Sequence, residues 1–188
     1  MNMTRINFNY WNSGNYAALR KRYGDKTVIG QKPDLSEVEP SAAQLAVRER
    51  FREAAMYGKI VMADAATKAL YTEAAEAKGQ PAFSLTVADF FNAPSVHEVD
   101  LSAYGGAVGD EIIIIARDDF EVLGVAVNLS ESDGSLIESG AAVETPADSG
   151  RWIYTSTASV VTGTTVRIAV TASDRPGGLG TAEEEKTL

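Results

Sequence analysis

The chain has 188 residues and no cysteine, so it can bury a core in one medium domain or two small ones, and disulfides and thiolate metal sites are excluded. Its net charge of −9 argues against a general nucleic-acid binder, which needs clustered Lys and Arg to displace counterions. Residues 1–92 carry 12 basic and 10 acidic side chains (net +2), whereas residues 93–188 carry 5 and 16 (net −11). This asymmetry predicts two units with different surroundings.

Residues 1–40 show no clear hydrophobic period, and their first half mixes asparagine and glycine with aromatic side chains. Exposed aromatic side chains are unfavourable in water, so we expect this segment to pack against its own helices or another subunit. Basic residues follow, and prolines at 33 and 40 favour an extended connector. The candidate docking residues are Phe8, Tyr10, Trp11, Tyr16, Arg20, Lys21 and Arg22.

Residues 41–92 carry the helical signals. Ser41 and Gln44 have the spacing of a capping box and predict the start of a first helix. Asp64 is a candidate cap for a second helix, which runs to Lys78 and is stopped by a glycine. Ser84 is the expected cap of a third, short helix over 85–92. Three helices of this size predict a small bundle or a cap on the following domain.

From residue 93 the hydrophobic period becomes alternating, and turn signals separate short apolar runs. Short strands at this spacing are typical of a sandwich or barrel. Residues 179–188 form an acidic tail that we expect to be disordered or a poor last strand. The predicted strands cover 96–101, 111–117, 122–130, 135–142, 151–157 and 164–172.

Within residues 93–178, a series of segments occurs in a definite order: Gly109 to Ala116, Val122 to Leu129, Asp133-Gly134, Gly150 to Tyr154, and Val166 to Asp174. In this order and spacing the region resembles bacterial and phage immunoglobulin-like modules. The resemblance implies an α+β chain, in which an N-terminal helical region precedes a C-terminal immunoglobulin-like antiparallel β-sandwich. The pattern departs from such modules after Asp174, which leaves a sheet edge able to accept a neighbour's strand.

The N-terminal half contains Lys32-Pro33, Pro40-Ser41, Gln44-Leu45, Arg48 and Phe51. In these residues it loosely resembles leader regions of small structural proteins from phages and mobile elements. By analogy, the resemblance implies a role in a virion.

Few residues suggest chemistry. The single histidine, His97, lacks a nucleophile motif, so we expect no catalytic residue, no enzyme activity and no cofactor. Acidic loops offer an alternative, because Asp118, Asp119 and Asp174 could supply oxygen ligands to Ca²⁺ at one sandwich end. Aspartates are also common turn formers, and no metal is favoured. Trp152 and Tyr154 share a strand face, where they either stack on a sugar or fill the core.

Together these patterns favour a non-enzymatic structural subunit of a multi-copy assembly, specifically a phage virion protein such as a head decoration, fibre-base or connector protein. We expect it to be made in the host cytoplasm and to contact other virion proteins and copies of itself, but not nucleic acid or membrane. The alternative is a secreted or cell-surface module that binds glycans or proteins. The start of the chain shows no apolar signal region, which argues against that alternative.

Overall fold

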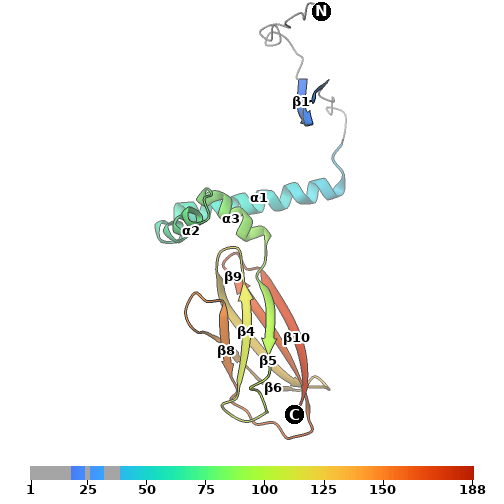
Figure 1. Cartoon of the computed structure of the whole chain (residues 1–188), viewed down its shortest axis with the longest axis vertical. Coiled ribbons are helices and arrows are strands. Elements are labelled where there is room, and N and C mark those ends of the chain that lie inside the picture. The colour runs from blue at the N-terminus through green and yellow to red at the C-terminus, as the bar shows by residue number, and fades with distance from the viewer. Residues whose placement is uncertain (1–17, 24–25, 32–38) are drawn as a thin grey trace, which may run out of the picture. The chain divides into compact units, whose positions relative to one another are not determined.

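The computed structural model describes residues 18–23, 26–31 and 39–188 (Figure 1). The chain separates between Leu45 and Ala46 into two units, and the second unit holds most of the helices and all of the large sheets. The fold is α+β, as predicted: three helices precede two antiparallel sheets of four strands each.

A short hairpin lies near the N-terminus, where the sequence predicted an extended docking segment. Strand β1 (Ala18–Tyr23) pairs with β2 (Lys26–Gln31) in antiparallel register. The candidate docking residues Arg20, Lys21 and Arg22 lie on β1, whereas Phe8, Tyr10, Trp11 and Tyr16 lie outside the described residues. Docking through this segment therefore stays a prediction.

Helix α1 (Ala42–Ala63) begins at the predicted capping box. The Gln44 N–H donates to Ser41 Oγ at 3.3 Å, and the Ser41 N–H donates to Gln44 Oε1 at 3.0 Å. These reciprocal bonds satisfy two donors that a helix start leaves free.

Helix α2 (Ala65–Ala77) is capped as predicted by Asp64, which accepts from the Thr67 N–H at 2.8 Å. Helix α3 (Ala82–Phe91) starts earlier than predicted. Pro81 takes the cap position with φ −64° and no side-chain hydrogen bond, so Ser84 lies inside the first turn instead of capping it. Proline suits a helix start because its φ is fixed near the required value.

The helices share a small core. Val61 of α1, Tyr71 and Ala75 of α2, and Leu85 of α3 are buried together. Gly58 allows α1 to approach α3 closely, because a Cβ at this position would lie 2.7 Å from Thr86 Oγ1. A small core of this kind stabilises little by itself, so the helices depend on what they pack against.

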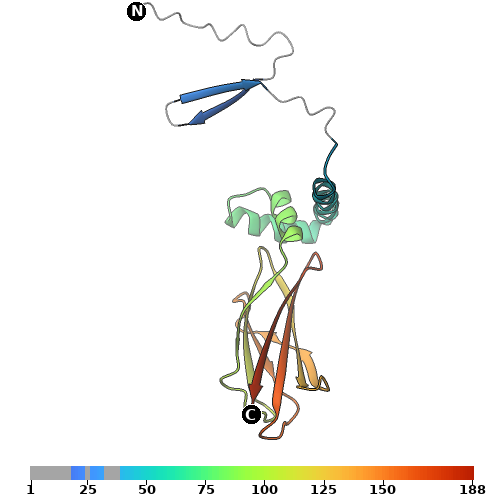
Figure 2. The ribbon, with the colours of Figure 1, turned by 90° about the vertical axis from the view of Figure 1, so that its right-hand side faces the viewer.

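The strands from β3 onward form two sheets with the orders β3-β4-β8-β7 and β10-β9-β5-β6 (Figures 1 and 2). The six predicted strands are confirmed to within two residues at each end, and β7 was not expected. Their bounds are β3 (Ser95–Asp100), β4 (Glu111–Arg117), β5 (Val122–Glu131), β6 (Leu136–Ala141), β7 (Val143–Glu144), β8 (Arg151–Thr155), β9 (Thr165–Asp174) and β10 (Leu179–Thr187).

The two sheets share one apolar core and therefore pack as a β-sandwich. Alternate side chains of β4, β5 and β9 point into it, as the period of two requires. Ile114, Val127 and Ile168 are completely buried. Trp152 and Tyr154 also belong to this core. Of the two roles considered for them, they therefore fill the interior and do not form a sugar-stacking surface.

The acidic tail is a strand, contrary to the expectation of a disordered or poor last strand. β10 pairs with the whole of β9, so this sheet edge is occupied. The acidic side chains are accommodated because they face solvent, where Glu183 lies 2.8 Å from Arg167. Lys186 donates to the carbonyl oxygens of Leu101 and Tyr104, which ties β10 to the chain after β3.

Candidate functional site

The most unusual chemistry lies where the helices meet the sandwich. Two of the three predicted acidic residues come together there: Asp118 follows β4 and Asp174 ends β9. Each lies close enough to raise the pKa of the third aspartate of the cluster, Asp89 of α3. We call Asp89, Asp118 and Asp174 the acidic junction. The sequence analysis missed Asp89, although Leu85 lies four residues earlier on the same buried face.

Asp119, the third predicted acid, makes different contacts. Its side chain accepts from Asn92 Nδ2 at 2.5 Å, and its carbonyl oxygen accepts from the Lys78 ammonium. Asp119 therefore links the helices to the β4–β5 loop. Within residues 39–188 and the N-terminal hairpin, no group of three or more His, Cys, Asp or Glu is arranged to hold a metal ion. Calcium binding at Asp118, Asp119 and Asp174 stays a prediction.

A chain of hydrogen bonds reaches Asp89 from the other two helices. The hydroxyls of Tyr57 and Tyr71 lie 2.8 Å apart, and the Tyr71 hydroxyl donates to Asp89 Oδ2. The Tyr71 ring also stacks on Phe120 of the β4–β5 loop, with centroids 3.9 Å apart. Tyr71 thus contacts both the polar network and the sandwich loop.

The carboxyl groups of the junction are buried and incompletely bonded. Asp89 is 0% exposed and Asp174 5%. Asp174 Oδ1 accepts from the Gly177 and Gly178 N–H groups. Among the described residues, Asp89 Oδ1, Asp174 Oδ2 and both carboxylate oxygens of Asp118 have no donor partner. Buried carboxylates without donors are costly unless they take up a proton.

The pKa values follow from this environment. Burial raises the pKa of Asp89 to about 7; the hydrogen bond from Tyr71 opposes this, and the charges of Asp118 and Asp174 add to it. Burial also raises the pKa of Asp118, and the charge of Asp174 contributes. Asp89 and Asp118 are neighbouring buried carboxyls whose negative charges would repel each other, which favours the protonated form of one of them. Asp89, the more buried of the two, is the better holder of that proton.

One arginine lies beside the acids but is already engaged. Arg175 Nη2 donates to Glu121 Oε2 at 2.7 Å, and the hydrogen bond raises the pKa of Arg175. Its Nε is buried without a partner among the described residues. Arg175 therefore forms its ion pair with Glu121.

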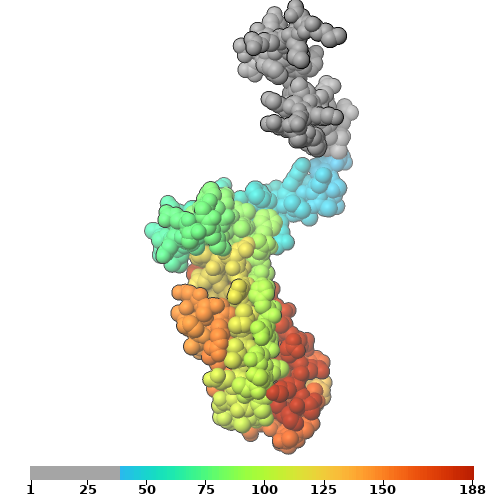
Figure 3. Space-filling view, in the orientation of Figure 1, coloured from blue at the N-terminus to red at the C-terminus, as the bar shows by residue number. Residues whose placement is uncertain are grey.

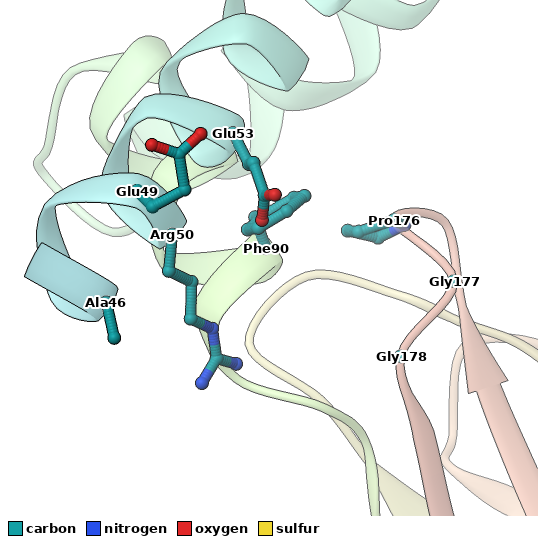
Figure 4. A pocket seen from close by; sticks show the side chains of 8 residues that line it. All are labelled: Ala46, Glu49, Arg50, Glu53, Phe90, Pro176, Gly177 and Gly178. Carbon is teal, nitrogen blue, oxygen red and sulfur yellow. The ribbon is translucent and has the colours of Figure 1, made fainter. Parts of the chain in front are cut away.

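A groove of about 520 Å³ runs between α1, α3 and the β9–β10 turn (Figure 4). Phe90 and Pro176 lie on its two sides, and Arg50 and Glu53 of α1 line it. The Arg50 guanidinium donates to the Phe91 carbonyl oxygen at 3.0 Å and lies 5.2 Å from the Phe91 ring centroid. These contacts anchor the middle of α1 to the end of α3.

His97 forms the one contact that suggests a catalytic pair. Its Nε2 lies 3.1 Å from Ser95 Oγ on the exposed side of β3. Among the described residues, no carboxylate hydrogen-bonds His97, so the third member that would orient such a pair is lacking there.

No helix in the described part of the chain is both long and apolar enough to span a bilayer. No family model matches the chain, and no curated protein matches it. Several solved structures are similar to part of it, two of them as follows. CopC from Methylosinus trichosporium is 12% identical, with a TM-score of 0.37, and the match covers 49% of this chain and 89% of CopC. A conjugative transposon lipoprotein from Bacteroides eggerthii is 13% identical, with a TM-score of 0.26, over 49% and 92% of the two chains.

Proposed function

We propose that this chain is a non-enzymatic structural subunit of a multi-copy assembly, which it joins through its N-terminal half and helix α1. The observation that carries the proposal is an uncovered apolar stripe on α1. Val47 and Phe51 are 65% and 55% exposed. Apolar side chains of this size are unfavourable in water when they lie together, and they mark contact surfaces.

The stripe continues a packing face that is covered further along the helix. Val47, Phe51, Ala54, Gly58 and Val61 are spaced by alternating steps of four and three, which places them on one side of α1. The last three are buried, whereas the first two are exposed, and Phe51 has only the Phe91 ring of α3 beside it, with centroids 6.4 Å apart. Met56 and Ile60 are exposed on another side of the same helix. We call Val47 and Phe51 the α1 seam.

We further propose that the sandwich is an immunoglobulin-like module, as the sequence resemblance implies. The support is the strand order. β3-β4-β8-β7 has the order of strands A, B, E and D of such a fold, and β10-β9-β5-β6 has the order of G, F, C and C′. The buried tryptophan differs, because Trp152 lies on β8 rather than on the strand equivalent to C. The module carries the helices at one end (Figure 3).

The virion is the proposed setting, on the analogy of the N-terminal resemblance. Its test is mass spectrometry of purified particles, in which the chain should occur in a fixed ratio to the major particle protein. The alternative, a surface module that binds glycans, would need a stacking platform other than Trp152 and Tyr154, which are only 7% and 4% exposed. Trp152 is therefore not a useful site at which to probe glycan binding.

Light scattering of the full-length chain over a wide concentration range tests the proposal. We expect the mass to rise with concentration, and a calcium chelator to leave it unchanged. Val47→Ser combined with Phe51→Ser should abolish the rise, because the apolar area of the α1 seam is lost. The control variant, Leu136→Ser with Val161→Ser, removes two side chains that are 65% and 79% exposed on the sandwich.

A chain that stays at the mass of one copy at every concentration would contradict self-association. Association that survives the double change in the α1 seam would contradict the role of that seam. Association lost equally in the control variant would show that exposed apolar area in general, rather than α1, drives it.

A further inference from the structure

The contacts between helices and sandwich converge on one short loop. Lys78 and Asn92 bond Asp119, Tyr71 stacks on Phe120, and Asp89 meets Asp118. These partners come from α2, from α3 and from the residue after α3, whereas residues 118–120 are consecutive. Any change in this loop therefore acts on both helices at once.

We infer that the acidic junction is a proton-operated latch, which holds α2 and α3 on the sandwich while the buried Asp89 carboxyl carries a proton and loosens them when Asp89 ionises. The geometry carries the inference. Asp89 comes from the helices and is completely buried, with Oδ1 lacking a donor, and Asp118 and Asp174 of the sandwich likewise have buried oxygens without donors, so the carboxyls of the junction lie on both sides of the interface. Without the proton, Asp89 and Asp118 become adjacent buried anions that repel each other.

The surroundings do not offset that repulsion. The groups that face Asp89 are the hydroxyl of Tyr71 from α2, with Tyr57 of α1 behind it, and the carboxyls of Asp118 and Asp174 from the sandwich. Among the described residues, Arg175 follows Asp174 in the chain but is paired with Glu121, and Lys78 bonds a carbonyl oxygen. Loss of the proton thus leaves three neighbouring carboxylates without a dedicated counter-charge.

Two clefts approach the latch from the surface, although Asp89 itself is completely buried. Asp118 lines both clefts, one of about 320 Å³ beside Phe120 and Glu121, and one of about 220 Å³ beside Asn92 and His97. The carboxylate oxygens of Asp118 are themselves buried, so a proton reaches them by a small local movement beside these clefts.

The direction of the pH response follows from the raised pKa of Asp89. A carboxyl whose pKa is about 7 when docked, and near its ordinary value when undocked, favours the docked state at low pH. That contribution is complete below the ordinary carboxyl pKa of about 4 and is lost as pH rises through about 7. Between pH 5.5 and 8.5 we expect the opening equilibrium of α2 and α3 to shift by at least about tenfold.

Hydrogen exchange of the full-length chain, corrected for the intrinsic pH dependence of exchange, tests the latch. Peptides that cover α2 and α3 should lose protection between pH 5.5 and 8.5, while those from β4 and β9 should not. Asp89→Asn should remove this difference, because its amide can donate to Asp118 and accept from Tyr71 at any pH. Asp133→Asn, in an exposed turn, is the control and should behave like the unmodified chain.

A second variant keeps the test decisive if Asp89→Asn fails to fold. Tyr71→Phe removes a hydrogen bond that lowers the pKa of Asp89, so the loss of protection should move to higher pH. A carbon-13 titration of the aspartate carboxyls should also show one group with a midpoint near 7, absent from Asp89→Asn. Protection that is independent of pH in the unmodified chain, or a pH response unchanged in both variants, would overturn the inference.

Discussion

The helices and the sandwich differ in the kind of side chains that they bury. The sandwich closes over a continuous apolar core, in which Ile112, Leu129 and Val170 are completely buried. The helices bury a handful of side chains, and their interface depends on Tyr71 and Asp89, which carry polar groups. An apolar core carries no titrating groups and responds little to pH near neutrality, whereas a buried polar interface changes with each proton it gains or loses. The sandwich is thus the fixed part, and the helices are the part that conditions can adjust.

Truncation of the sandwich core should give the largest effect. Ile168→Ala leaves a cavity between the sheets and should cost about 2–5 kcal/mol of unfolding free energy, measured by urea denaturation with far-UV circular dichroism. Val161→Ala, at a side chain that is 79% exposed, is the matched control and should cost far less. Equal costs would mean that the described core is not where stability resides.

Removal of the Tyr71 hydroxyl should be next in size. Tyr71→Phe leaves Asp89 Oδ2 without its donor and should cost about 1–3 kcal/mol at neutral pH. Tyr57→Phe should cost less, because the Tyr57 hydroxyl is only partly buried and its loss leaves the bond to Asp89 in place. Thermal unfolding of both variants at the same pH checks the order. If Tyr57→Phe costs more stability than Tyr71→Phe, the hydrogen-bond network depends more on α1 than on α2.

The carboxylate of Glu138 should give the sandwich the opposite pH response. Burial alone would raise its pKa, but hydrogen bonds from Ser156 and Thr157 outweigh burial and hold the pKa below its usual value. Its stabilisation is therefore present above the ordinary pKa and is lost as pH falls through the lowered one. Glu138→Gln should cost about 1–2 kcal/mol at pH 7 and less near pH 3, measured by urea denaturation at each pH. A cost that grows in acid would contradict this assignment.

A substitution at the close contact between α1 and α3 should have a smaller effect on stability. Gly58→Ala gains helix propensity but places its Cβ against Thr86 Oγ1 and the Phe83 ring. We expect a net loss of about 1 kcal/mol, because overpacking exceeds the propensity gain. Thr86→Ala in the same chain should reduce that loss, which a double-mutant cycle measures. A stabilised Gly58→Ala would mean that Phe83, which is 39% exposed, moves aside at little cost.

Surface charges on the last sheet should matter least. Arg167→Ala breaks the ion pairs with Glu183 and Glu185, whose side chains are more than half exposed. The loss should stay below about 1 kcal/mol and shrink with added salt. A larger, salt-independent loss would show that Arg167 acts through its apolar stem.

The sequence predicts some elements of the helices and of the sandwich better than others. The caps at Ser41 and Asp64 and the alternation in β4 and β9 are local signals, so the elements that they mark were predicted correctly. β10 was missed because its acidic run looks unlike a strand until Arg167 and Lys186 are placed beside it. Such pairings join distant residues, and no local pattern contains them.

The candidate site shows the same limit. Asp118 and Asp174 were expected at one sandwich end, and both lie there, because β4 and β9 of the two facing sheets end at the same side of the sandwich. Asp89 was missed although it carried a signal: it is an acid four residues after Leu85, on the apolar side of a helix. Its pairing with Asp118 depends on how α3 packs on the sandwich, which a single sequence does not reveal.

β10 pairs with β9 and lies beside β3. This arrangement also affects the order in which the chain folds. Gly180 lies against the backbone of Pro94. The first and last strands of the sandwich are therefore in contact although most of its sequence separates them. Contacts of such separation close late, because the intervening loop must first be ordered at an entropic cost. During synthesis the helices emerge long before residues 179–187, and they have no completed sandwich on which to settle. We therefore expect the last strand to be the step that commits both regions to their final arrangement.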